Sequence, residues 1–343
     1  MGVQLTELLI KKPITFADLK GKVVAIDAFN QLYQFLTSIR QPDGQPLTDS
    51  SGNTTSHLIG LFSRTTRMLQ QGIRPIFVFD GTPPKLKTAE RERRKALKQA
   101  AAQKYETATQ EHDLKGMKKF ASRTSRLTTD MVIEAKELVE TFGLPAITAP
   151  SEGEAQAAHL VREGKAYALV SQDADGLLFG ASRLIRNLSF TGRRKNAGRV
   201  TTEHTDPELV DLNDVLTHLD ISQEQLICLA LLVGTDYNIG GIRGIGPKKA
   251  LGLIKKHKDP KDIFSEIKWD EQFPFPWQDA FDLFVNMPVN NDLSLIWNAP
   301  NEDKLIKLLV EKHEFSRARV EGALESLSTG RGKQQQKGLG EFI

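Results

Sequence analysis

Four short apolar segments, each leading into carboxylate residues, constrain the fold of this chain more than any other feature of its sequence. They span residues 21–29 (GKVVAIDAF), 74–81 (RPIFVFDG), 144–150 (LPAITAP) and 166–175 (AYALVSQDAD), and residues 183–188 (RLIRNL) repeat the apolar pattern. Continuous runs rich in Val, Ile and Phe are typical of strands buried on both faces, as in parallel sheets covered by helices. The sequence therefore predicts five strands of a largely parallel sheet.

Helical patterns fill the intervals between these runs. Residues 54–71 place apolar side chains at roughly helical spacing and stop at Gly72, and residues 128–142 do the same and stop at Gly143. Strands that alternate with helices indicate an α/β fold. We expect a largely parallel central sheet with helices on both faces.

The segment 84–127 interrupts this alternation, because it is highly charged and has few large apolar residues. It is expected to be helical at least over 90–110 and to stand off the body as an arm. Residues 240–257 (GGIRGIGPKKALGLIKKH) indicate a glycine hairpin that runs into a basic helix, and a helical region follows over 259–328. The tail, 329–343, is low in complexity and is expected to be flexible until bound.

Charge is distributed unevenly along the chain. Residues 85–126 contain 13 Lys or Arg against 5 Asp or Glu, a local charge of +8 within a net charge of +3, so the rest of the chain carries −5. A basic segment on a mildly acidic body indicates a polyanionic partner that is gripped at one place, although solvated helix faces also carry such runs.

Other features of the sequence exclude some classes of protein. The single cysteine, Cys228, lies in an apolar run, so it is expected to be buried, and a disulfide framework within the chain is excluded. No stretch approaches the roughly 20 apolar residues of a membrane-spanning helix. Gly2 and Thr6 fit the loose pattern for N-myristoylation, but nothing else indicates a membrane.

Seven carboxylates fall where strands end or helices begin. They are Asp27, Asp80, Glu152, Glu154, Asp173, Asp175 and Asp236. Taken singly, such residues are often helix caps. Together they would meet at the carboxyl edge of the sheet, where a like pair at ~4 Å repels by about 4 kcal/mol at an effective dielectric near 20. Cations would relieve this repulsion, and oxygen ligands without nearby His or Cys favour Mg²⁺ or Mn²⁺ over zinc.

A pair of such ions is the usual apparatus for phosphodiester hydrolysis. One ion activates water and the other stabilises the leaving oxygen during in-line displacement. The acidic site and the basic segment then have complementary roles, since the metals perform the chemistry while Lys and Arg hold phosphates.

The motifs VAIDA, FVFDG, EGEAQAA, SQDADGLLFG and LVGTDYN resemble the flap endonuclease family in order and spacing, over residues 1 to about 256 and in the C-terminal tail. This resemblance implies a single nuclease domain over 1–328, with all seven carboxylates as ligands of two Mg²⁺ ions. Its implied parts are an N-terminal part (1–98), a helical arch (84–127), an internal part (128–256) with a helix-hairpin-helix (240–256), and a C-terminal helical part (259–328). Mn²⁺ is an alternative metal.

The resemblance also implies contacts with DNA. Lys87 and Arg94 match the pair that steers the scissile phosphate, and Tyr33 matches an aromatic residue that stacks on a base, although its helical spacing alone would place it in the core. Gly2 matches an N-terminal position close to DNA. At the hairpin, Gly244 and Gly246 would approach a phosphate, with K⁺ between them. Lys248 and Lys249 would add charge behind the hairpin.

The end of the chain resembles a peptide that binds a sliding clamp. Gln336, Leu339, Phe342 and Ile343 fit that pattern, although the last position is Ile where an aromatic residue is usual. The chain stops at this peptide, as in the archaeal branch of the family. The resemblance implies a monomeric intracellular protein, in the cytoplasm or nucleoid if archaeal and in the nucleus if eukaryotic.

The predicted function is a structure-specific 5′ flap endonuclease with 5′–3′ exonuclease activity, acting in DNA replication (Okazaki fragment maturation) and repair. Rivals within the superfamily are an exonuclease, a bubble-cutting repair nuclease and a junction resolvase. A phosphatase built on DADG is disfavoured, because Leu177 stands where Thr or Val is usual and the DNA features stay unexplained. A scaffold without activity is disfavoured by the complete set of seven carboxylates.

Overall fold

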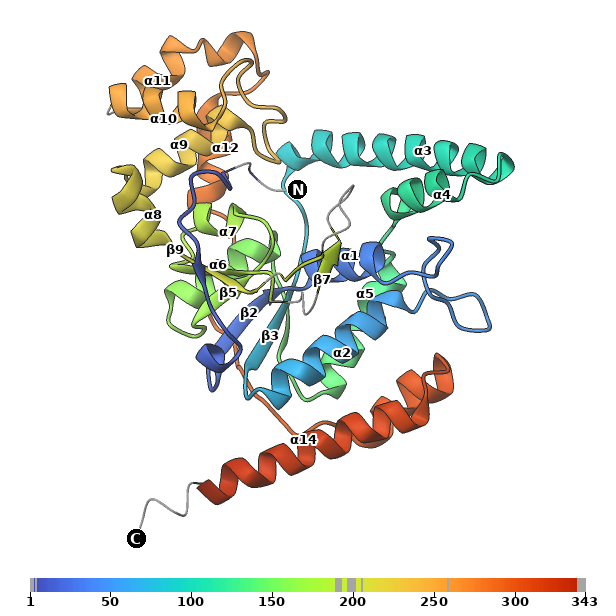
Figure 1. The fold of residues 1–343 in the computed structure, drawn as a ribbon. Coiled ribbons are helices and arrows are strands. Elements are labelled where there is room, and N and C mark those ends of the chain that lie inside the picture. The colour runs from blue at the N-terminus through green and yellow to red at the C-terminus, as the bar shows by residue number, and fades with distance from the viewer. Residues whose placement is uncertain are drawn as a thin grey trace.

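A seven-stranded sheet lies at the centre of the molecule, with strand order β1-β9-β6-β5-β2-β3-β4 (Figure 1). This computed structural model describes residues 3, 5–188, 193–195, 202–204, 206–257 and 259–337. The strands are β1 (Lys12–Pro13), β2 (Val23–Asp27), β3 (Arg74–Phe79), β4 (Ala146–Thr148), β5 (Ala168–Val170), β6 (Arg183–Arg186) and β9 (Glu208–Asp211).

The five predicted strands are confirmed as β2 to β6, and they pair in parallel in the order β6-β5-β2-β3-β4. The sequence missed β1 and β9, which add an antiparallel edge next to β6. β1 has two residues and β9 has four, of which only Leu209 and Val210 are strongly apolar, so neither strand forms an apolar run that the sequence could reveal. The short hairpin of β7 (Arg193–Lys195) and β8 (Thr202–His204) was also missed.

Alternate residues of the central strands supply two separate cores. Val24 and Ile26 of β2 pack into one core and Ala25 into the other. Because successive strand residues point to opposite faces, each strand needs helices on both sides. One core is covered by α1 (Ala28–Ser38), α2 (Ser56–Gln70), α5 (Thr129–Thr141), α13 (Glu302–Leu305) and α14 (Arg317–Lys337). The other is covered by α6 (Gly153–Arg162), α7 (Asp175–Leu178), α8 (Leu212–Leu219), α9 (Gln223–Val233), α10 (Pro247–Lys256), α11 (Pro260–Glu266) and α12 (Trp277–Val285).

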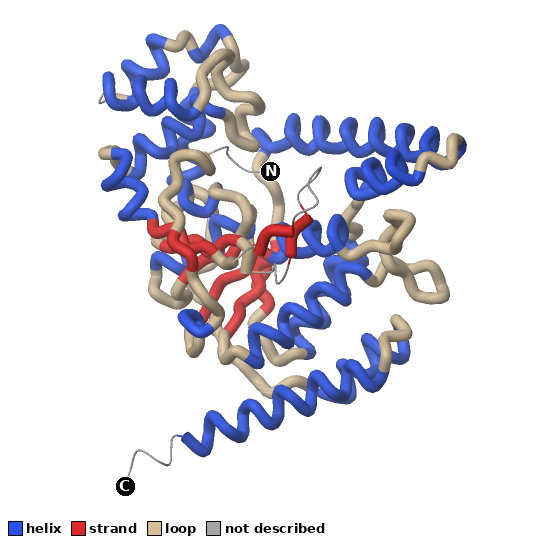
Figure 2. Tube along the Cα trace, viewed as in Figure 1, coloured by secondary structure: helices blue, strands red, loops and turns tan. Residues whose placement is uncertain are grey.

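This arrangement confirms the α/β fold with helices on both faces, and Figure 2 shows the strands enclosed between helices. The two helices predicted between strands are α2 and α5. Cys228 is buried in α9, as predicted, and burial raises the pKa of its thiol to about 12.

An arm leaves the body after β3. It consists of η2 (Lys85–Lys87), α3 (Thr88–Gln110), α4 (Leu114–Ala121) and η3 (Ser122–Thr124). In Figure 1, α3 runs outward from the body and α4 folds back beside it. Only Glu90, Ala101 and Ala108 of α3 are buried. The helix predicted over 90–110 is thus observed within an arm that has little apolar surface to bury.

The C-terminal part departs from the predicted continuous helical region. Between α12 and α13, residues 286–301 form no helix and cross from one core to the other. Along this crossing, Trp297 Nε1 donates to the carbonyl oxygen of Pro75 at 3.1 Å, and Asn298 N donates to the carbonyl oxygen of Gly143 at 2.8 Å. The segment Ile306–Lys312 that follows α13 is π-helical.

The last helix extends further than the sequence predicted. A flexible tail was expected from residue 329, but α14 continues to Lys337. Each residue added to an existing helix forms another backbone hydrogen bond, and Gln and Lys have good helix propensity. Gln336 therefore lies on α14, while Gly2, Leu339, Phe342 and Ile343 lie outside the described residues.

Among the described residues, no single helix is long and apolar enough to cross a membrane. The pair α8 and α9 passes such a test only when the two are joined across a bend of 79°. Most of α9 is buried in the core.

Candidate active site

The carboxylates predicted at strand ends converge at the carboxyl edge of the sheet. Asp27 ends β2 and caps α1, where its Oδ1 accepts a hydrogen bond from Asn30 N at 3.0 Å. Asp80 follows β3, and its Oδ1 accepts from Gly153 N at 2.7 Å. The two strands are parallel neighbours, so both carboxylates lie at the same end of the sheet.

The start of α6 lies against Asp80 because residue 153 has no side chain. A Cβ atom at Gly153 would lie 2.7 Å from Asp80 Oδ1. This close approach places Glu152, the cap of α6, and Glu154, in its first turn, beside the strand ends. Glu154 Oε1 accepts from Ser171 Oγ at 2.7 Å.

Three further carboxylates complete the acidic site. Asp173 follows β5, and its Oδ2 accepts from Asn30 Nδ2 at 3.0 Å. Asp175 begins α7, and its Oδ1 accepts from the backbone amide of Val3 at 2.7 Å. Asp236 lies three residues after the end of α9.

Burial and mutual repulsion perturb these groups strongly. Burial, followed by the charge of Asp80, raises the pKa of Asp27 to about 8. Burial and the charges of Asp173 and Asp236 raise the pKa of Asp175 to about 7. The pKa of Glu154 lies well above its usual value, because burial is reinforced by neighbouring aspartates. A bound cation would offset the repulsion between these carboxylates and favour their ionised forms, so a group of this kind favours cation binding.

The arm contributes positive charge to this acidic group. Lys87 Nζ donates a hydrogen bond to Glu152 Oε2 and lies 3.5 Å from Asp236 Oδ2. Arg94 Nη2 donates to Asp236 Oδ1 at 2.6 Å. Burial would lower the pKa of Lys87, but the charges of Glu152 and Asp236 outweigh burial and raise it. The two residues predicted to act together do converge: Lys87 ends the short helix η2 immediately before α3, and Arg94 lies within α3.

The donor set of the site fits hard divalent cations. Every predicted ligand offers carboxylate oxygens, and Glu152 Oε1 is buried without a hydrogen-bond donor in the described part of the chain. As the side chains stand, no three acidic, His or Cys residues among those described are grouped closely enough to hold one ion. Lys87 and Arg94 already pair with Glu152 and Asp236, so ion binding would require these contacts to rearrange.

Sequence reasoning missed Asn30, which connects two of the carboxylates. Its backbone amide donates to Asp27 and its side-chain amide donates to Asp173. It also missed Glu90, whose carboxylate accepts from Arg94. A polar residue three positions after the strand-end aspartate is the only local signal for Asn30, and such a residue is common at helix starts.

Tyr33 lies on the surface of α1 and not in the core. Its side chain is 36% exposed, and Lys98 of α3 places Nζ 4.7 Å from the ring centroid. The ring is therefore accessible beside the arm, as stacking on a base requires.

The glycine hairpin connects α9 to α10, which forms the predicted helix-hairpin-helix arrangement. Gly244 has a φ of +79°, a conformation that favours glycine, whereas Gly246 caps α10 with a negative φ. Lys249 Nζ donates to the Gly244 carbonyl oxygen at 3.1 Å. Lys248, also in the first turn of α10, is exposed.

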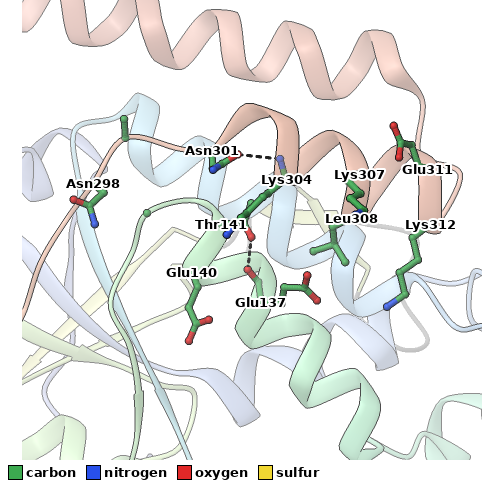
Figure 3. A pocket seen from close by; sticks show the side chains of 12 residues that line it. Glu137, Glu140, Thr141, Asn298, Asn301, Lys304, Lys307, Leu308, Glu311 and Lys312 are labelled. Carbon is green, nitrogen blue, oxygen red and sulfur yellow. Dashed lines mark hydrogen bonds between the residues drawn. The ribbon is translucent and has the colours of Figure 1, made fainter.

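A cavity of about 810 Å³ lies away from these groups, between α5 on one side and α13 with Ile306–Lys312 on the other (Figure 3). Glu137, Glu140 and Glu311 line it together with Lys304, Lys307 and Lys312. None of the seven carboxylates lines this cavity, so the candidate site is the acidic edge of the sheet.

Residues 1–101 match the XPG N-terminal domain, and residues 143–236 match the XPG I-region. Flap endonuclease 1 of Hyperthermus butylicus is 48% identical over 330 residues, which cover 95% of this chain and 94% of that protein. The chain belongs to the flap endonuclease family. Flap endonuclease 1 of Pyrococcus furiosus is 45% identical over 95% of each chain. Family membership confirms the predicted DNA nuclease, and nucleases of this family depend on divalent metal ions.

Solved structures agree with this assignment. Flap endonuclease-1 from Methanococcus jannaschii is 40% identical and has a TM-score of 0.77, covering 97% of this chain and all of that one. The catalytic core of Rad2 in complex with DNA substrate is 26% identical, with a TM-score of 0.67, over 92% of this chain and 96% of that one. Human GEN1 in complex with Holliday junction DNA shares the fold, with a TM-score of 0.70 at 20% identity, over 98% of this chain and 80% of that one.

Proposed function

We propose that the protein is a structure-specific 5′ flap endonuclease with 5′–3′ exonuclease activity, which removes 5′ flaps in DNA replication and repair. The observation that carries this proposal is the contact of the basic arm with the acidic edge of the sheet, through Lys87 and Arg94. A 5′ single strand held under the arm would bring its junction phosphate to the carboxylates. Family membership supports the same activity.

The seven carboxylates would hold two Mg²⁺ ions, and Mn²⁺ is the alternative. When bound, the ions supply an activated water and neutralise the leaving oxygen. Arg94 and Lys87 would exchange their contacts with Asp236 and Glu152 for phosphate oxygens, and Arg94 can contact phosphate through two parallel N–H donors. Asn30 and Ser171 would keep the ligand carboxylates oriented.

Recognition of the DNA would depend on its shape. Tyr33 would stack on a base next to the cut, a contact that is indifferent to sequence. Gly244, Gly246, Lys248 and Lys249 would grip the duplex backbone, with K⁺ between hairpin and phosphate, and Gly2 would lie near DNA. Phosphate contacts of this kind position a protein but do not read bases.

The C-terminal peptide would bind a sliding clamp through Gln336, Leu339, Phe342 and Ile343. Replacement of Phe342 by Ala should abolish binding of the clamp, measured by calorimetry, while flap cleavage without the clamp is unchanged. Unaltered clamp affinity in that variant would remove the peptide from the proposal. We also propose a monomeric intracellular protein, with a single nuclease domain over 1–328.

The decisive experiment is cleavage of an end-labelled double-flap DNA with and without Mg²⁺. A sharp metal-dependent product at the base of the flap, absent with single-stranded or plain duplex DNA, supports the proposal. Ladders from free 5′ ends would favour an exonuclease, and cutting of four-way junctions in preference to flaps would favour a junction resolvase. Binding of flap DNA without cleavage would instead favour a DNA-binding scaffold without nuclease activity.

A further inference from the structure

Glu90 is an acidic residue buried in the basic arm, and the functions assigned above do not explain it. Its exposed fraction is 2%, lower than the 6% of Asp27 in the acidic site. It lies in the first turn of α3, where a carboxylate is favoured by the helix dipole. The helix dipole favours a carboxylate at this position whether or not it is buried, so the dipole does not explain why Glu90 is buried.

Both oxygens of Glu90 accept hydrogen bonds from arginines. Arg93 donates through Nε to Oε2 at 2.6 Å and through Nη2 to Oε1 at 2.8 Å. Arg94 donates through Nε to Oε1 at 2.6 Å. Burial opposes ionisation of Glu90, but the hydrogen bonds from Arg93 and Arg94 outweigh it and lower the pKa of the carboxyl. Glu90 is therefore an anion held between two guanidinium groups.

Arg94 donates hydrogen bonds from two of its nitrogens to carboxylates that belong to different parts of the fold. Its Nε donates to Glu90 of the arm, and its Nη2 donates to Asp236 of the body at 2.6 Å. A guanidinium group is planar and its donors are rigidly arranged, so two such contacts fix both its position and its plane. Without Glu90, Arg94 would keep its contact with Asp236 but lose the contact of its Nε with the arm.

We propose that Glu90 is a positioning residue, which holds the guanidinium group of Arg94 in the orientation that contacts the scissile phosphate. The inference rests on the proposed function, because it assigns Glu90 a role only through the phosphate contact of Arg94. Arg93 also donates to Glu90, but its side chain is 41% exposed.

The test compares single-turnover cleavage and DNA affinity for a 5′-flap substrate in five forms of the full chain. These are the unsubstituted protein, Glu90→Gln, Glu92→Gln, Arg94→Ala and the double variant Glu90→Gln with Arg94→Ala. Glu92 is exposed on the same helix turn, so it is the matched control for loss of one negative charge. Glutamine keeps the size of Glu90 and removes the anion.

We expect Glu90→Gln to lower the cleavage rate by about 10- to 100-fold, the scale for a misaligned transition-state contact, with DNA affinity changed by less than about twofold. Glu92→Gln should stay within about twofold of the unsubstituted protein. In the Arg94→Ala background, Glu90→Gln should cause no further loss, because the residue it positions is gone.

Two results would overturn the proposal. One is a Glu90→Gln variant that cleaves as fast as the unsubstituted protein. The other is a loss that persists in full in the Arg94→Ala background, as damage to the fold of the arm would. Failure of the unsubstituted protein to cut any flap substrate would instead refute the proposed function, and this inference would fall with it.

Discussion

Asn30 Nδ2 donates a hydrogen bond to Asp173 Oδ2 at 3.0 Å, across 143 positions of the chain. The backbone amide of Asn30 also donates to Asp27, so one residue at the start of α1 orients carboxylates from two strands. Residues that orient metal ligands typically contribute 10- to 100-fold in metal affinity or activity.

Replacement of Asn30 by Ala should raise the Mg²⁺ concentration needed for half-maximal flap cleavage by about 10-fold or more, because Asp173 loses the side-chain donor that orients it, while the backbone contact with Asp27 remains. Titration of the cleavage rate with Mg²⁺ measures this. Thr37→Ala, at an exposed position of the same helix, is the control. An unchanged metal titration in Asn30→Ala would show that Asp173 is oriented without this side chain.

Replacement of Asp175 by Ala should reduce cleavage by about 10³-fold or more while leaving substantial binding of flap DNA, because the metals act on the chemistry and the arm and hairpin hold the DNA. Rate and affinity are measured on the same labelled flap, with Asp270→Ala as an exposed control. Retained cleavage in Asp175→Ala would refute the two-metal assignment.

The free energy of unfolding should depend on pH in the absence of divalent metal. The folded pKa of Asp27, about 8, lies above its usual value of 3.8, so between these values the folded chain keeps a proton that the unfolded chain has lost. Stability from this group is therefore lost as pH rises from about 4 to 8, by up to about 1.4 kcal/mol per pH unit.

Urea unfolding in EDTA at several pH values measures this dependence. Asp27→Asn should weaken it, because that side chain does not titrate, and Mg²⁺ should raise stability most at the alkaline end, where the carboxylates ionise. A stability that rises between pH 5 and 8 in EDTA, with the same slope in Asp27→Asn, would contradict the expectation.

Tyr33→Ala should weaken cleavage of flap DNA by roughly 5- to 150-fold, the range that corresponds to the loss of about 1–3 kcal/mol of base stacking. Tyr33→Phe should cleave almost normally, since it keeps the ring next to Lys98. Single-turnover rates of the two variants separate the ring from the hydroxyl. Equal losses in both would assign the effect to the hydroxyl instead.

Gly60→Ala should destabilise the fold by about 1–3 kcal/mol, because the added Cβ would lie 2.2 Å from the ring of Phe35 where α1 packs on α2. Gly252→Ala in α10 is the control, because nothing lies within 4 Å of its Cβ. That change should stabilise by up to about 1 kcal/mol through helix propensity. Thermal unfolding of both variants gives the comparison, and equal melting temperatures would show that α1 can shift freely.

The sequence by itself determined the strands that carry the chemistry. The apolar runs before Asp27 and Asp80 are local patterns. A strand that is buried on both faces needs apolar side chains at successive positions, so such a strand can be recognised from a short stretch of sequence. The positions of the carboxylates at one edge followed from the parallel arrangement. Family motifs in register added Lys87, Arg94 and Tyr33, which spacing alone would have left as surface charges and a core aromatic residue.

Only the tertiary structure decided which residues support the site. The hydrogen bonds from Asn30 to Asp173 and from the Val3 amide to Asp175 join residues more than a hundred positions apart, and no local period encodes such pairs. In the sequence, Glu90 looks like an ordinary acidic residue in the first turn of a helix. Its proposed role depends on the contacts of Arg94 with both Glu90 and Asp236, which only the folded chain brings together. Such contacts arise when separate elements pack, because hydrogen-bond partners are selected by distance in space and not along the chain.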